Sequence, residues 1–120
     1  MLPMTTLIED IQALLNPLAA GGAWYAVNTS EPPVFPYIVW QRIVSTSNNT
    51  FAGPSDLQNT RIQIDVYALK VSDMSAIETS IEVVMAGASI KNVLLSSEDL
   101  YESELRAYRC SKDYSVWATN

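Results

Sequence analysis

The sequence holds few residues that could do chemistry. There is no histidine, which removes the commonest general base and the commonest metal ligand together. The one cysteine, Cys110, lies on an apolar strand face, which is more typical of a small buried hydrophobe than of a nucleophile. The four glycines form no phosphate-binding loop, and no serine lies in a Gly-x-Ser-x-Gly turn. We therefore expect a protein that is not an enzyme and has no catalytic, cofactor-binding or metal-binding residue.

Four carboxylates near the C-terminus deserve comparison with a calcium site: Glu98, Asp99, Glu102 and Glu104. They lack the alternating ligand spacing and the central glycine of an EF-hand loop. We interpret residues 96–103 (SSEDLYES) as an acidic, turn-rich link that faces solvent.

Composition limits the class of protein. With 120 residues, of which 48% are hydrophobic, the chain has the size of one domain spanning residues 1–120. The net charge of −6 and seven scattered basic residues argue against a nucleic-acid or membrane-surface binder. No apolar run approaches the roughly 18 residues of a membrane span, and no secretory signal opens the chain. We expect a soluble protein that is made in the cytoplasm.

The most regular element is residues 58–69, QNTRIQIDVYAL. Side chains alternate between the two faces of a strand. The predicted inner face is apolar and the outer face is polar, with Arg61 and Asp65 as a possible ion pair. We expect this strand at the centre of a sheet, with an inner face that holds Thr60, Ile62, Ile64, Val66 and Ala68 and an outer face that holds Asn59, Arg61, Gln63, Asp65 and Tyr67.

The first half of the chain predicts a helix and two strands. Thr6 and Glu9 form a capping box for a helix that ends at Asn16–Pro17. A short strand is expected over residues 23–28 and a second over residues 37–45, with apolar residues on both faces of the second. Residues 46–57 (TSNNTFAGPSDL) read as a long loop that would form a mobile hairpin arm.

The second half predicts one helix and two strands. Ser72 is the expected N-cap of a helix whose apolar stripe contains Met74, Ile77, Ile81, Val84 and Ala88. A short strand is expected at residues 93–95 and the last strand at residues 104–118. The order is α-β-β-β-α-β-β. It predicts an α+β fold, with a mostly antiparallel sheet of about four to five strands and two helices packed on one face.

Several short segments recur in an order and spacing that resemble a known family. They are Tyr37–Arg42 (YIVWQR), Leu57–Tyr67 (LQNTRIQIDVY), Asp99–Glu102 (DLYE), and Tyr108–Arg109 followed by Asp113–Trp117 (DYSVW). Together they resemble the tailed-phage tail completion family, which is similar to tail-terminator proteins. The resemblance runs from about Pro36 to Trp117.

This resemblance implies a structural protein of the virion tail, assembled in the cytoplasm of the host bacterium. Such proteins form a homo-oligomeric ring, usually a hexamer, on the head-proximal end of the tail tube. The ring stops tube polymerisation and presents a surface to the head-neck connector protein. DNA passes through the ring without specific binding.

A ring of identical chains needs head-to-tail contacts that close by rotation. The candidate assembly residues are Phe51 and Pro54 in residues 46–57, Arg61, Gln63, Asp65 and Tyr67 on the outer strand face, and Trp117 in the last strand. Two alternatives stay open: another phage neck or minor tail component, and a small-molecule-binding domain, which a deep pocket with convergent polar groups would favour.

Overall fold

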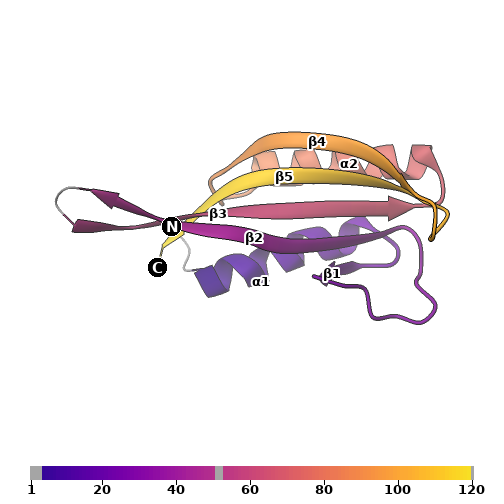
Figure 1. The fold of residues 1–120 in the computed structure, drawn as a ribbon, viewed down its shortest axis with the longest axis horizontal. Helices are drawn as coiled ribbons and strands as arrows, with labels where there is room; N and C mark the ends of the chain where they lie inside the picture. Colours follow the sequence, from indigo (N-terminus) through magenta and orange to yellow (C-terminus); the bar gives the residue numbers. More distant parts are fainter. Residues whose placement is uncertain (1–3, 51–52, 120) are drawn as a thin grey trace.

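The computed structural model describes the backbone of residues 4–50 and 53–119, and the side chains of residues 6–43 and 59–118. The elements follow the predicted order (Figure 1). They are α1 (Met4–Leu15), a 3-10 turn (Asn16–Leu18), β1 (Ala23–Tyr25), β2 (Tyr37–Thr50), β3 (Gly53–Ala68), α2 (Val71–Gly87), β4 (Asn92–Glu102) and β5 (Ala107–Thr119).

The strands form one five-stranded sheet in the order β1-β2-β3-β5-β4. β2, β3, β5 and β4 pair antiparallel, whereas β1 pairs parallel with β2. The sheet is therefore mixed rather than purely antiparallel. The parallel pair follows from the long connection over residues 26–36, since parallel neighbours need a crossover and cannot be joined by a tight turn.

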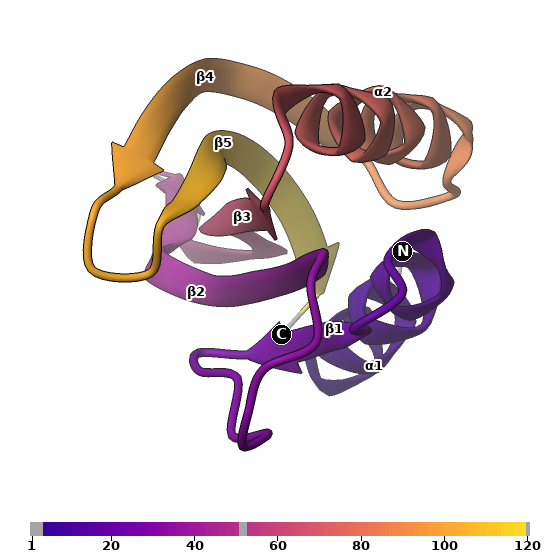
Figure 2. The ribbon, with the colours of Figure 1, turned by 90° about the vertical axis from the view of Figure 1, so that its right-hand side faces the viewer.

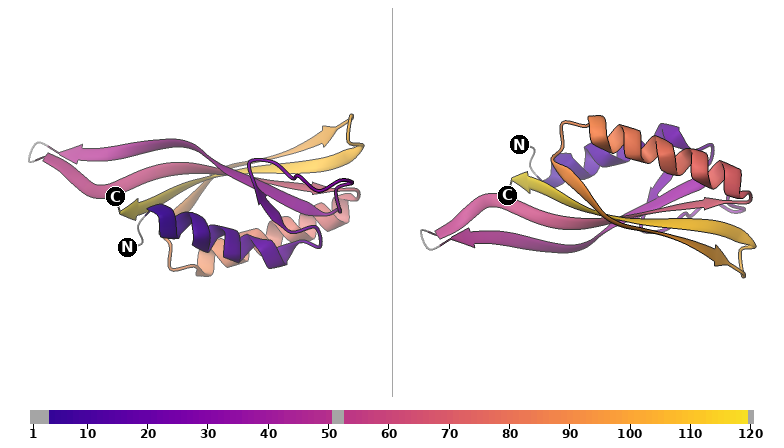
Figure 3. Two further views of the ribbon diagram at one scale, coloured as in Figure 1. Left: turned by 90° about the horizontal axis from the view of Figure 1, so that it is seen from below. Right: turned by 90° about the horizontal axis from the view of Figure 1, so that it is seen from above.

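Both helices cover the same face of the sheet, as the two views in Figure 3 show. The core forms where this face meets the helices, and the predicted central strand provides its middle: all five residues of the predicted inner face of β3 are buried. α1 contributes Leu7, Ile11 and Leu15, and α2 contributes Met74, Ile77, Ile81 and Met85. The α+β class, the two helices on one face and the central position of β3 are confirmed.

The outer edge of β1 is closed by side chains from the N-terminal segment. Asn16 Oδ1 accepts a hydrogen bond of 3.0 Å from the backbone N–H of Ala23, and Gln12 Nε2 donates one of 2.7 Å to the Ala23 carbonyl. Gln12 Oε1 also accepts a bond of 2.7 Å from the indole Nε1 of Trp40. One glutamine thus joins α1, β1 and β2.

Two segments that were predicted as loops are strands. Residues 46–57 continue β2 and β3 almost to their turn, with Ser47 opposite Gln58 and Asn49 opposite Pro54. This paired extension, which we call the arm (residues 46–50 and 53–57), projects beyond the helices (Figure 1). Residues 96–102 belong to β4, and the turn is confined to residues 103–106. In both segments backbone pairing forms strands although the side chains show no apolar alternation.

Several element ends also differ from their predictions. α1 begins at Met4 and contains Thr6, so Thr6 does not cap it. At the start of α2, Lys70 occupies the N-cap position without a side-chain cap, so the prediction of Ser72 was wrong. Met85, rather than Val84 or Ala88, completes the buried stripe of α2, because it lies four residues after Ile81. β1 ends at Tyr25 and β5 begins at Ala107.

The apolar residues of β2 are not all buried, although Tyr37, on the face opposite to Ile38 and Trp40, is only 5% exposed. Ile38 and Trp40 are buried against the helices, but Ile43 is 47% exposed. Within the part of the chain that the model describes, neither helix is long and apolar enough to cross a membrane.

Candidate assembly surface

The face of the sheet turned away from the helices, here called the open face, carries most of the predicted assembly residues. Strand alternation places Arg61, Gln63, Asp65 and Tyr67 on this face of β3. The register of β5 places Trp117 on the same face, opposite Asn59. Pro54 lies in the arm with its backbone opposite Asn49, and Phe51 lies outside the described residues. Five of the seven residues therefore share one surface.

Arg109 contacts two carboxylates and an aromatic ring at one end of the open face. Its Nη2 lies 2.8 Å from Asp65 Oδ2, and its Nη1 lies 2.9 Å from Glu102 Oε1. The guanidinium lies 5.6 Å from the centre of the Tyr67 ring, which in turn stacks on Tyr37 at 5.0 Å. Burial opposes the charge on Arg109, but Glu102 and Asp65 outweigh this effect and raise its pKa. The arginine is therefore held in place as a charged group.

Asp65 is only 6% exposed, although it lies on the open face. Besides Arg109, it accepts hydrogen bonds of 3.1 and 3.0 Å from Gln63 Nε2. The predicted pair of Arg61 with Asp65 was wrong. Residues four apart in a strand are separated by about 13 Å, which is too far for an ion pair, so the charged partners of Arg61 and Asp65 come from β5 instead.

Arg61 instead pairs with Asp113 of β5, with 2.8 Å between Nη2 and Oδ2. At the same end of the face, Asn59 Nδ2 donates a hydrogen bond of 2.8 Å to Ser115 Oγ, and the Lys91 ammonium lies 5.2 Å from the centre of the Trp117 ring. The open face is thus a fixed array of compensated charges. Such an array can hold a defined shape against another protein, because little side-chain entropy remains to be lost.

A second polar cluster lies between the sheet and α2. Lys112 is completely buried, and its Nζ lies 3.2 Å from both Glu78 Oε1 and Glu82 Oε1. Burial opposes its charge, but hydrogen bonds with Glu82 and Glu78 raise its pKa above the ordinary value. Alternation along β5 puts Lys112 on the inner face, yet the sequence gives no sign that two carboxylates meet it there.

Cys110 neighbours this cluster and is completely buried, which confirms its interpretation as a buried hydrophobe. Its sulfur lies within 4.8 Å of carboxylate oxygens of Glu78 and Asp99, so the three residues could in principle surround a metal ion. Lys112, however, already neutralises Glu78, with 3.2 Å between its Nζ and Glu78 Oε1. The observed arrangement is therefore an ion pair beside a buried thiol.

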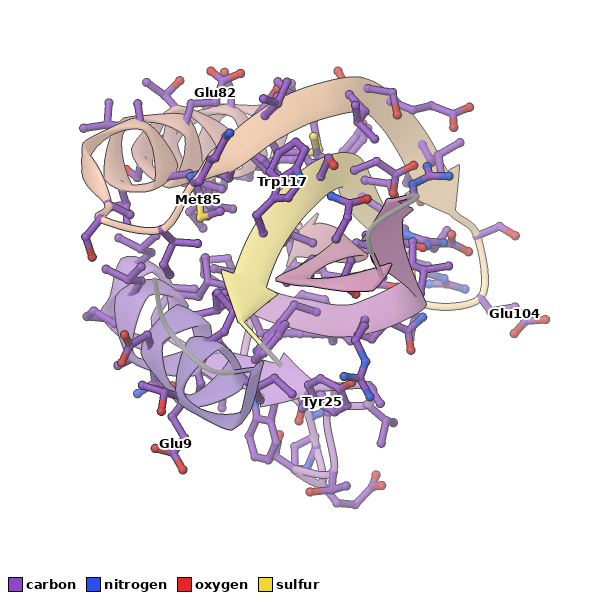
Figure 4. The ribbon with its side chains drawn as sticks, turned by 90° about the vertical axis from the view of Figure 1, so that its left-hand side faces the viewer. Glu9, Tyr25, Glu82, Met85, Glu104 and Trp117 are labelled. Carbon is purple, nitrogen blue, oxygen red and sulfur yellow. The ribbon has the colours of Figure 1, made fainter. Side chains whose placement is uncertain are left out.

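A groove of about 600 Å³ lies between α1 and β1. Glu9 and Tyr25 line this groove and are labelled in Figure 4, where the Glu9 side chain points outward. The Tyr25 ring packs edge-on against Trp40, with 4.8 Å between the ring centres. The amide of Gln12 is already engaged by Ala23 and Trp40. The groove is open rather than deep, and the polar amide of Gln12 in its wall is already bonded within the chain, so this amide is not free to fix the orientation of a ligand.

These features define a two-layer α+β protein with an ordered polar sheet face, a projecting arm and, among the described residues, no catalytic constellation. The family model of Tail completion protein gp17 matches residues 9–119, and the chain belongs to this family. It is therefore a structural component of the phage tail that takes part in virion assembly. No curated protein matches the chain.

Proposed function

We propose that the protein caps the head-proximal end of the tail tube as a ring, which is a hexamer in the virion. The ring ends tube polymerisation and presents the docking surface for the head-neck connector. The observation that carries the proposal is the match of the tail completion family over residues 9–119. Completion of a tail requires that a growing tube stop at one end and that this end then accept a different partner.

The shape of the chain supports a role in assembly. The arm extends a molecule whose principal dimensions are 52 × 25 × 22 Å. An element that projects from the body can reach a neighbouring subunit or the tube protein without moving the core. The open face offers a second contact surface, in which Tyr67 and Trp117 lie among fixed ion pairs.

The charge of the chain supports a lumen through which DNA passes. A net charge of −6 repels phosphates, so a ring of these chains would not hold the DNA that moves through it. Two cations of the open face are already paired with carboxylates: Arg61 with Asp113, and Arg109 with Asp65 and Glu102. We propose assembly in the host cytoplasm, where tube protein and connector are also present.

Electron microscopy of tails made without this protein tests the proposal. We expect overlong tubes without heads, and normal tails after the wild-type chain is supplied in trans. Tails of normal length that lack only another part would assign the protein to a different neck or minor tail position. Light scattering of the chain, alone and with tube protein, measures the size of the ring.

A further inference from the structure

The two open edges of the sheet differ in charge. β4 has 11 residues (NVLLSSEDLYE), with three acidic residues and no basic one. β2 (YIVWQRIVSTSNNT) has one basic residue, Arg42, and no acidic one. The two strands lie on opposite sides of the β3–β5 pair, as the end-on view in Figure 2 shows.

β4 is an edge strand with little protection. Natural edge strands are usually short, carry lysine or proline, or are covered by another element. β4 has neither residue type, and among the described residues no backbone hydrogen bond reaches its outer side. Its pairing with β5 has one register shift, which lies between Leu94 and Ser96. Three apolar or aromatic side chains of β4 are also exposed: Val93 is 50%, Leu95 is 51% and Tyr101 is 55% exposed.

β2 is also open over most of its length. β1 covers it only from Ile38 to Trp40, and the Tyr25 hydroxyl accepts a hydrogen bond of 3.3 Å from the Arg42 N–H just beyond. From residue 43 onward β2 runs past β1 into the arm. Asn16 and Gln12 already bond the outer edge of β1. On this side of the sheet, the described backbone edge that is free to pair with another strand is therefore that of β2.

We propose that the outer edge of β4 pairs with the edge of β2 beyond Arg42 in a second copy of the chain, which deepens the ring proposal and rests on it. Strand addition provides backbone hydrogen bonds along the contact, and the acidic edge selects a partner edge without acids. Two copies of β4 would instead bring like charges together. Because the two edges differ and lie on opposite sides of one sheet, the contact is heterologous and can close into a ring.

Crosslinking with a matched control tests the pairing. In a Cys110→Ala background, chains with Val93→Cys and Ile43→Cys are assembled on tubes and treated with a short bismaleimide. The control carries Val83→Cys and Ile43→Cys, since Val83 is 67% exposed but lies on α2. We expect a ladder of linked chains for the first pair and none for the second. Rings that are visible on tube ends but give no ladder would overturn the pairing and leave the capping function intact. Absence of rings with the wild-type chain would overturn both.

A charge exchange gives an independent readout. Glu98→Lys should lower the fraction of capped tubes several-fold, whereas Glu31→Lys, an equal charge change in the exposed connection over residues 26–36, should not. Equal effects of Glu98→Lys and Glu31→Lys, with melting temperatures unchanged, would contradict the proposal.

Discussion

The buried ammonium of Lys112 lies 3.2 Å from a carboxylate oxygen of Glu78, a contact that fastens β5 to α2. Glu82, one helical turn further along, makes an equivalent contact from the same helix. Glu78 and Glu82 keep side-chain exposures of 25% and 48%, so water can still reach the two carboxylates, whereas the lysine depends on them entirely.

Replacing Lys112 by methionine should therefore destabilise the fold by about 2–4 kcal/mol, because two carboxylates are left beside an apolar side chain without their cation. Urea unfolding measures the change. Adding Glu78→Gln and Glu82→Gln to the methionine variant should recover much of the loss, since neutral amides have a smaller desolvation cost than carboxylates. A methionine variant as stable as the wild type would show that the cluster does not hold α2 in place.

The environment of Cys110 predicts a particular pH dependence. Burial raises the pKa of its thiol from 9.0 to about 11 in the folded chain. Between these two values the unfolded chain releases the thiol proton and the folded chain keeps it, so stability falls as pH rises through this window. Below pH 9 the thiol is protonated in both states and this effect is absent.

Unfolding free energies from pH 8 to 11 measure this dependence, with Cys110→Ala as the control. Burial also raises the pKa values of Tyr37, Tyr67 and Tyr114, which lower stability in the same direction. The alanine variant should therefore keep a weaker slope. Equal slopes for the two chains would contradict the assignment to Cys110.

The two arginines of the open face should respond differently to substitution by lysine. Lysine cannot reproduce the forked contact of Arg109 with Asp65 and Glu102, so Arg109→Lys should cost about 1–2 kcal/mol. Arg61 makes one contact and its side chain is 43% exposed, so Arg61→Lys should cost less than about 0.5 kcal/mol. Urea midpoints of both variants give the comparison, and equal losses would argue against a central role for Arg109.

Gly21 and Gly87 provide a matched pair of alanine substitutions. A Cβ at Gly21 would collide with the Val34 carbonyl and lie 2.9 Å from both the Pro36 oxygen and Tyr37 Cβ. Gly21→Ala should therefore destabilise the chain by about 1–3 kcal/mol. At Gly87, the last residue of α2, a Cβ meets nothing within 4 Å, and alanine should stabilise by up to about 1 kcal/mol. Thermal melts check both values, and a tolerated Gly21→Ala would mean that the connection over residues 26–36 can shift away.

Sequence reasoning succeeded where one face of an element is buried. The inner face of β3 could be read from alternation because helices cover it, and the stripe of α2 because the sheet covers it. It predicted only residues 93–95 of β4 and missed the strand pairing of residues 96–102 and of the arm. β4 is exposed along nearly its whole length, so no periodic apolar pattern marks it.

The interaction partners of the open-face residues could not be predicted from the sequence either. Arg61, Gln63, Asp65 and Tyr67 were placed on one face correctly, but the partners of Asp65 depend on the register between β3 and β5. A one-residue shift would exchange the faces of β5, and no short-range pattern fixes that register. Arg109 and Lys112 were missed for this reason.

The bridge made by Gln12 has a spectroscopic consequence. Trp40 is 1% exposed and its indole N–H is bound to the Gln12 side chain, whereas Trp24 and Trp117 are only partly buried. Separation of α1 from the sheet would bring water to Trp40 and shift its emission to longer wavelength. The natural fluorescence of the chain therefore reports whether its N-terminal helix is docked, before and after the protein joins a tail.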